Sequence, residues 1–168
     1  MINKKNKPNK VKQGVGAYDE ALNFLTPKAR SVRETENHLD ECDYSEVEIT
    51  QTIERLLGNG LLDDRKYAEN FVETRLNTKP ISRQRLREQL EGHFIPEELI
   101  DEALSAVDDE RELNNAREIA EKYFRQFSGL DMEERLRRVG IRLMSRGYSF
   151  DDIKLALTEL TEEIPDDE

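Results

Sequence analysis

Arginine is the residue type in this chain whose spacing most clearly supports a binding chemistry. Its guanidinium group carries a planar set of donors that fits carboxylates and phosphates. Residues 75–87 include five bases and no acid, and residues 135–150 include five arginines and no acid. At about 100° per helical residue, four arginines of the second segment fall within an arc of about 80°. This arginine stripe consists of Arg135, Arg138, Arg142 and Arg146.

We expect the arginine stripe to have an anionic partner, because four like charges on one helix face repel one another. The partner is internal if Asp151 and Asp152, which begin the next predicted helix, or other acidic helices lie alongside it. It is external if the stripe meets nucleic-acid phosphate or the acidic surface of another protein. The bases of the first segment are the next candidate contact group, and they are Lys79, Arg83, Arg85 and Arg87.

The charge balance of the chain favours a protein partner. The net charge is −11, and residues 1–16 carry five lysines and no acid, so the remainder carries −16. A body this acidic disfavours broad, sequence-independent attraction to nucleic acid, and it leaves only a weak, local DNA contact open. We therefore expect the basic residues to bind an acidic protein surface first.

The sequence offers no catalytic constellation. It contains neither a Gly-x-x-x-x-Gly-Lys phosphate loop nor a Gly-x-Gly-x-x-Gly turn. His38 and His93 lack metal-ligand spacing to Cys42, the one cysteine, and are interpreted as helix-end residues. The adjacent acids Asp63 and Asp64 are interpreted as helix caps rather than as an acid/base pair. We expect no catalytic residue, no metal and no cofactor.

The elements that carry these residues are predicted to be about nine helices. Apolar residues recur at intervals of three and four, and no segment alternates with period two. Aligning the helix junctions puts three dipeptides in register, 50 and 54 residues apart: Tyr44-Ser45, Phe94-Ile95 and Tyr148-Ser149. Tight turns at residues 58–60 and 146–148 end helices in the same scheme. The predicted fold is all-α, with three tandem three-helix repeats forming an elongated, curved array.

The expected boundaries are a disordered basic tail at 1–16, repeats at 17–61, 62–107 and 108–161, and an acidic frayed tail at 162–168. Three serines are predicted to cap helices: Ser31, Ser45 and Ser82. Four apolar or aromatic residues are predicted to lie in the core: Val47, Leu57, Tyr67 and Phe71. No signal peptide or run of eighteen apolar residues is present. We expect a soluble, cytoplasmic protein that is monomeric.

Residues 60–71, Gly-Leu-Leu-Asp-Asp-Arg-Lys-Tyr-Ala-Glu-Asn-Phe, joined to residues 146–153, closely resemble the RecX family of bacterial recombinase regulators. Residues 21–25 and 86–90 also match, so the resemblance covers about residues 17–160. It implies three tandem three-helix units and a non-enzymatic protein. Such a protein binds the RecA recombinase filament on single-stranded DNA and restrains its assembly, ATP hydrolysis and strand exchange.

Two features depart from the family's usual pattern. Residues 92–94 read Gly-His-Phe where the family usually has a Lys-Gly-Ile-like turn, and the body of the chain is strongly acidic. Two other classes of protein stay open. One is a helix-turn-helix-like DNA-binding regulator, which the acidic third helices at 46–57, 97–107 and 151–160 argue against. The other is a generic helical scaffold.

Overall fold

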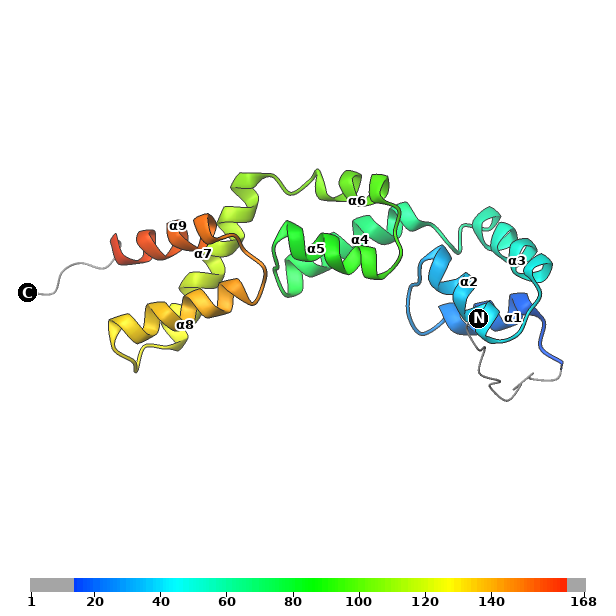
Figure 1. Cartoon of the computed structure of the whole chain (residues 1–168), viewed down its shortest axis with the longest axis horizontal. Coiled ribbons are helices and arrows are strands. Elements are labelled where there is room, and N and C mark those ends of the chain that lie inside the picture. Colours follow the sequence, from blue (N-terminus) through cyan, green and yellow to red (C-terminus); the bar gives the residue numbers. More distant parts are fainter. Residues whose placement is uncertain (1–13, 163–168) are drawn as a thin grey trace, which may run out of the picture. The chain divides into compact units, whose positions relative to one another are not determined.

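The computed structural model describes residues 14–162, and in this range it contains nine α-helices and no strand (Figure 1). The helices are α1 (Ala17–Leu25), α2 (Val32–Glu41), α3 (Glu46–Gly58), α4 (Asp64–Thr78), α5 (Arg83–Gly92), α6 (Glu97–Leu104), α7 (Asp109–Gln126), α8 (Met132–Met144) and α9 (Phe150–Glu162). The all-α prediction is confirmed. None of the helices is long and apolar enough to cross a membrane.

The predicted tails fall mostly outside the described residues. Of the basic tail at 1–16 the structure describes only residues 14–16, and of the acidic tail at 162–168 it describes only Glu162. Glu162 is the last residue of α9 rather than the first residue of a frayed tail. The acids of the preceding turn therefore belong to a helix.

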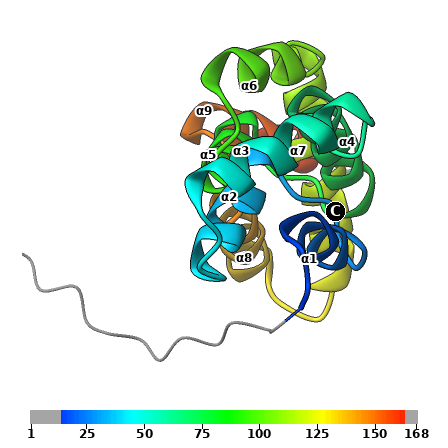
Figure 2. The same cartoon turned by 90° about the vertical axis from the view of Figure 1, so that its right-hand side faces the viewer.

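The chain divides into two compact units. The first contains the residues up to Tyr67 together with His93–Ile95, and the second contains Ala68–Gly92 and the residues from Pro96 onward. In the first unit α1, α2 and α3 pack against one another, and in the second α7, α8 and α9 do the same (Figures 1 and 2). The repeat boundaries at 61 and 107 stay a prediction.

Local hydrogen bonds explain where α2, α3 and α5 begin. Ser31 Oγ accepts from the backbone N–H of Glu34 at 3.1 Å, and the Glu34 carboxylate accepts from Ser31 N–H at 3.0 Å. This reciprocal capping box satisfies two amide donors that the helix leaves open. Ser82 Oγ accepts from the N–H of Arg85 at 3.1 Å. The caps predicted at Ser31 and Ser82 are confirmed, as is the cap at Ser45, which forms a second capping box.

The prediction of two capping acids before α4 is half correct. Asp63 Oδ1 accepts from the N–H of Lys66 at 3.0 Å and caps the helix. Asp64 Oδ1 instead accepts from the N–H of Val32, the first residue of α2, at 2.9 Å. Asp64 therefore ties α4 to α2 within the first unit. An equivalent bond in the second unit joins Glu112 Oε1 of α7 to the N–H of Arg83, the first residue of α5, at 3.0 Å.

Three hairpins share one construction: a fully buried leucine, a residue with positive φ four positions later, and a largely covered residue after that. The leucines are Leu39, Leu90 and Leu143, the positive-φ residues are Asp43 (64°), Phe94 (59°) and Gly147 (86°), and the covered residues are Tyr44, Ile95 and Tyr148. In the first and third hairpins the backbone N–H of the tyrosine donates to the leucine carbonyl, at 3.2 and 3.4 Å. This bond closes the helix C-terminus around the left-handed residue that precedes the tyrosine.

The register predicted for the second hairpin is wrong by one residue. Ile95, not Phe94, is equivalent to the two tyrosines, and Phe94 is 54% exposed. Phe94 occupies the left-handed position, with a φ of 59°. Matching aromatic to aromatic residues along the sequence misses this, because the backbone rather than the side-chain type defines the equivalence.

Fewer residues of α3 and α4 are buried than the pattern of apolar residues predicts. Val47 and Leu57 of α3 are 65% and 45% exposed, and Tyr67 and Phe71 of α4 are half-buried. A helix packed on one side buries a single stripe, and residues one position off that stripe lie at its edge. In α4 the fully covered stripe is Ala68, Val72 and Leu76.

Gly147 lies against the start of α5. The N–H of Ser82 donates to the carbonyl oxygen of Arg146 at 3.1 Å. A Cβ atom built on Gly147 would lie 2.7 Å from Ser82 Oγ and 3.1 Å from Arg85 Cβ. Only glycine fits here without displacing the cap of α5, and its φ of +86° also favours glycine.

Candidate partner-binding surface

The arginine stripe, which runs along α8 to the turn after it, lies over aromatic rings of α7 and of its C-cap residue Phe127. Distances from the guanidinium carbon to the ring centroid are 3.5 Å for Arg135 and Phe124, 6.0 Å for Arg138 and Phe127, 5.5 Å for Arg142 and Tyr123, and 5.0 Å for Arg146 and Tyr123. Each such contact is worth about 0.5–1 kcal/mol at an exposed site. The aromatic rings therefore stabilise four positive charges on one face, and a carboxylate beside each arginine is not needed.

Asp151 and Asp152 are not the internal partners of the stripe. The Asp152 carboxylate accepts from the Ser149 hydroxyl at 2.6 Å, and the Asp152 N–H donates to that hydroxyl at 3.1 Å. Between residues 14 and 162, neither aspartate pairs with an arginine of α8. The internal partners of the four arginines are aromatic rings, and a comparison of acidic and basic residues along the sequence does not reveal such partners.

The ends of the stripe are structural. Arg135 Nε donates to the carbonyl oxygen of Phe124 at 2.6 Å. Arg146 donates to the Tyr123 hydroxyl at 2.8 Å and to the Arg142 carbonyl at 3.2 Å. Both side chains are half-buried. They fix α8 to α7, and they leave the middle of the stripe as its accessible part.

The accessible positive charge belongs to Arg137, Arg138 and Arg142, all of which are exposed. Glu134 accepts from Arg137 Nε at 2.7 Å and from Arg138 Nε at 2.6 Å. These hydrogen bonds lower the pKa of Glu134 to about 2, and the bond from Arg137 contributes most. No carboxylate in the described part of the chain pairs with Arg142. Of these three cations only Arg137 and Arg138 share an anion, Glu134. Arg137 adds a charge that the 80° arc of the stripe leaves out.

The bases of the first segment do not form a comparable surface. Arg83 forms ion pairs with Glu112 and Asp109 and donates to the Val107 carbonyl at 3.2 Å. Because Glu112 is only 8% exposed, Arg83 is a structural link between α5 and α7. The other three differ: Arg87 pairs with Asp101, Arg85 pairs with Glu88 at 2.9 Å, and Lys79 is exposed.

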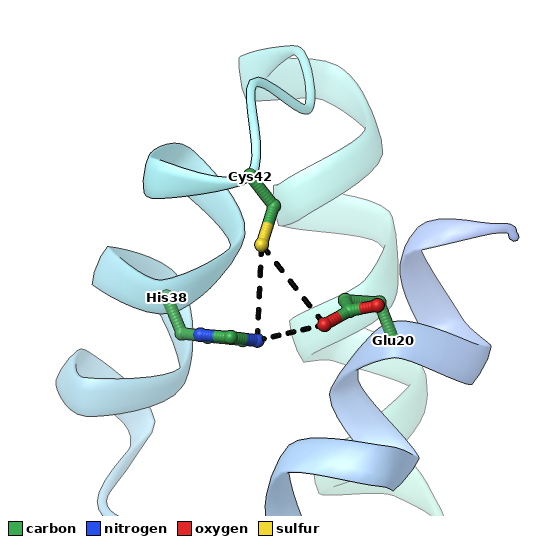
Figure 3. Close-up of side chains that lie close together, drawn as sticks. All are labelled: Glu20, His38 and Cys42. Carbon is green, nitrogen blue, oxygen red and sulfur yellow. Dashed lines mark hydrogen bonds and ion pairs between the residues drawn. The ribbon is translucent and has the colours of Figure 1, made fainter. Parts of the chain in front are cut away.

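The two histidines have specific partners within the first unit. His93 Nδ1 lies 3.0 Å from Glu34 Oε1, and its ring meets Tyr67 edge to face. His38 Nε2 lies 3.8 Å from Cys42 Sγ, so the prediction that these two residues are not spaced as ligands is wrong (Figure 3). They lie four residues apart near the end of α2, where one helix turn brings both side chains to the same side.

Family models match the chain in three consecutive parts. The first, second and third three-helix domains of RecX match residues 17–56, 63–104 and 109–157. The chain is thus a helical protein built from three three-helix domains. It belongs to the RecX family, and the resemblance read from residues 60–71 and 146–153 is confirmed.

Several relatives carry the name regulatory protein RecX. The protein of Chlorobium phaeobacteroides is 34% identical over 144 residues, which cover 86% of this chain and 93% of the relative. The protein of Bacillus licheniformis is 32% identical, and the match covers 89% of this chain but 56% of that relative. The chain thus spans little more than half the length of that relative. The crystal structure of RecX from Lactobacillus salivarius superposes with a TM-score of 0.73 at 27% identity, covering 87% of this chain and 95% of that structure.

Proposed function

We propose that this chain binds RecA recombinase, as the filament on single-stranded DNA, and inhibits filament assembly and activity in DNA repair and recombination. In this proposal it is a cytoplasmic, monomeric regulator without catalytic activity of its own. Membership of the RecX family supports the partner. The observation that carries the proposal is the exposed group of three arginines on α8, of which only two share a carboxylate.

An arginine-rich surface of this kind suits an acidic protein face. Arginine is over-represented among residues that dominate binding energy, because its fork donates to carboxylates in fixed geometry. Aromatic contacts with Phe127 and Tyr123 hold the Arg138 and Arg142 guanidinium groups in place before binding, which reduces the ordering cost that flexible side chains otherwise carry. DNA phosphate is the second anion that this surface fits, and the acidic remainder of the chain weakens that contact.

The decisive experiment is co-sedimentation with RecA filaments on single-stranded DNA, together with the RecA ATPase rate. Arg138→Glu/Arg142→Glu should weaken both filament binding and inhibition at least about tenfold, in the range of interface hot spots. The matched control is Arg111→Glu/Arg125→Glu on α7, because it makes the same charge change at exposed positions. Arg125 also pairs with a glutamate four residues away, as Arg138 does.

Three results would count against the proposal. Equal weakening by both double variants would indicate general charge repulsion rather than a contact surface. Sedimentation with single-stranded DNA alone, at the affinity seen with filaments, would favour the DNA-binding alternative. Normal inhibition by folded Arg138→Glu/Arg142→Glu would place the contact elsewhere, with the exposed bases Lys79 and Arg85 next to test.

A further inference from the structure

Three side chains of metal-binding type meet where α1 packs against the end of α2 (Figure 3). Glu20 comes from α1, His38 from the last turn of α2, and Cys42 from the C-cap of α2. His38 Nε2 lies 3.1 Å from Glu20 Oε1, and Cys42 Sγ lies 3.8 Å from that nitrogen and 4.0 Å from that oxygen. Glu20 is 6% exposed, and the other two are half-buried.

These separations match the edges of a zinc coordination tetrahedron. With bonds of about 2.0–2.2 Å to nitrogen and oxygen and about 2.3 Å to sulfur, tetrahedral geometry separates N from O by about 3.4 Å and S from either by about 3.6 Å. The three observed distances differ from these values by about 0.4 Å or less. A zinc ion at the centre therefore requires side-chain shifts of only tenths of an ångström.

We propose that Glu20, His38 and Cys42 bind a zinc ion, with the fourth position open to water or to a ligand from outside the cluster. The donor set of carboxylate, imidazole and thiolate combines the ligand types that zinc accepts. Binding converts the Cys42 thiol to a thiolate, and its proton leaves to solvent. The metal thereby joins α1 to α2 inside the first unit.

The surroundings already orient the ligands. The His38 ring stacks on Phe24 of α1 at a centroid distance of 4.0 Å and an interplanar angle of 5°. The guanidinium carbon of Arg30 lies 4.4 Å from the centroid of the Phe24 ring. The N–H of Cys42 donates to the carbonyl of His38 at 3.1 Å, which fixes the backbone that carries the thiol. Ligands held this way lose little freedom when a metal binds.

The competing account is an ordinary carboxylate–imidazole contact with a thiol beside it. It predicts no metal affinity beyond that of scattered surface acids, and no protection of the thiol by metal. The two accounts therefore differ in measurable ways on the untagged, full-length protein, and the RecA-binding surface on α8 plays no part in the test.

Cobalt(II) is the first probe, because a cysteine thiolate bound to it gives a near-ultraviolet charge-transfer band and tetrahedral geometry gives strong visible bands. We expect both bands at one equivalent of cobalt and their loss on adding zinc. Zinc should also slow modification of Cys42 by a disulfide reagent at least about tenfold, and a chelator should restore the rate. Absence of the thiolate band together with no protection would overturn the proposal, and neither measurement depends on a variant.

Variants then assign the ligands. Cys42→Ser should abolish the charge-transfer band, and His38→Gln and Glu20→Gln should each weaken zinc binding in calorimetry by at least about tenfold. His93→Gln is the matched control, because it removes the other histidine, which contacts Glu34 instead. Zinc binding of wild-type strength in folded His38→Gln, or equal weakening by His93→Gln, would refute the assignment.

Discussion

Replacing Gly147 by alanine should lower the free energy of unfolding by about 2–3 kcal/mol, which is a large fraction of a typical domain's stability. The left-handed backbone at φ +86° costs any residue with a Cβ about 1 kcal/mol. The new Cβ would also lie 2.7 Å from Ser82 Oγ, so this hydroxyl has to move. Moving it disturbs the cap on Arg85 N–H, and such a cap is worth about 1 kcal/mol.

Two other glycines separate these contributions. Gly60 has a φ of +69° and no atom within 4 Å of a built Cβ, so Gly60→Ala should cost only the backbone part, about 1 kcal/mol. Gly140 lies inside α8, and its built Cβ would make ordinary contacts at 3.6 Å or more. Gly140→Ala should therefore stabilise the protein by about 0.5–1 kcal/mol through helix propensity.

The assay is urea denaturation followed by circular dichroism, with hydrogen exchange in α5 and α8 to locate the loss in the second unit. In a Ser82→Ala background Gly147→Ala should cost about 1 kcal/mol less, because the hydroxyl that meets the new Cβ is gone. If Gly147→Ala proves no more damaging than Gly60→Ala, the argument from close approach is refuted. An additive double variant would contradict it as well.

Phe94→Gly should raise the free energy of unfolding by up to about 1 kcal/mol in the same assay, because relief of the left-handed strain exceeds the added unfolded-state entropy; a destabilised variant would contradict this. Although burial raises the pKa of Glu34, the Ser31 N–H together with His93 and Arg30 holds it below the usual 4.5. The stability that Glu34 contributes is present above pH 4.5 and lost as pH falls through the lowered pKa, so Glu34→Gln should flatten the acid side of a stability–pH curve; an unchanged slope would rule this out. Arg83→Ala should destabilise by about 1.5–3 kcal/mol, because it removes the charged partner of the buried Glu112 and leaves only the backbone N–H of residue 83, whereas Arg85→Ala should leave the urea midpoint nearly unchanged. Equal midpoints for the two variants would show that Arg83 is not structural.

Features determined within one helical turn could be predicted from the sequence. Ser31, Ser45 and Ser82 cap helices because a hydroxyl and an amide two or three residues apart interact locally. Whether Val47 is buried depends instead on which neighbour covers α3. The pattern of apolar residues does not contain that information, and Val47 is exposed. The register of Phe94 and Ile95 failed for a related reason, since a positive φ at a bulky residue leaves no signal in composition.

The residues of the candidate sites also divide into those that local helix geometry predicts and those that only tertiary packing brings together. Helical geometry predicted that the arginine stripe shares one face, but the rings beneath it come from α7, and only tertiary packing brings them there. Arg83 and its partner Glu112 are 29 residues apart. The four-residue spacing of His38 and Cys42 was a readable ligand signal, whereas Glu20 lies 18 residues before His38 on another helix.

The α5–α6 hairpin cannot replace the α8–α9 hairpin without a change at the start of α5. Gly147 allows the backbone of the α8–α9 hairpin to approach Ser82 so closely that a single Cβ would collide with the hydroxyl. Phe94 occupies the equivalent left-handed position of the α5–α6 hairpin and carries a whole ring there. A chain with residues 93–96 substituted for 146–149 would therefore lose the cap of α5. The identity of one hairpin residue, Gly147, is thus coupled to Ser82 in a different hairpin group, so these two positions have to change together.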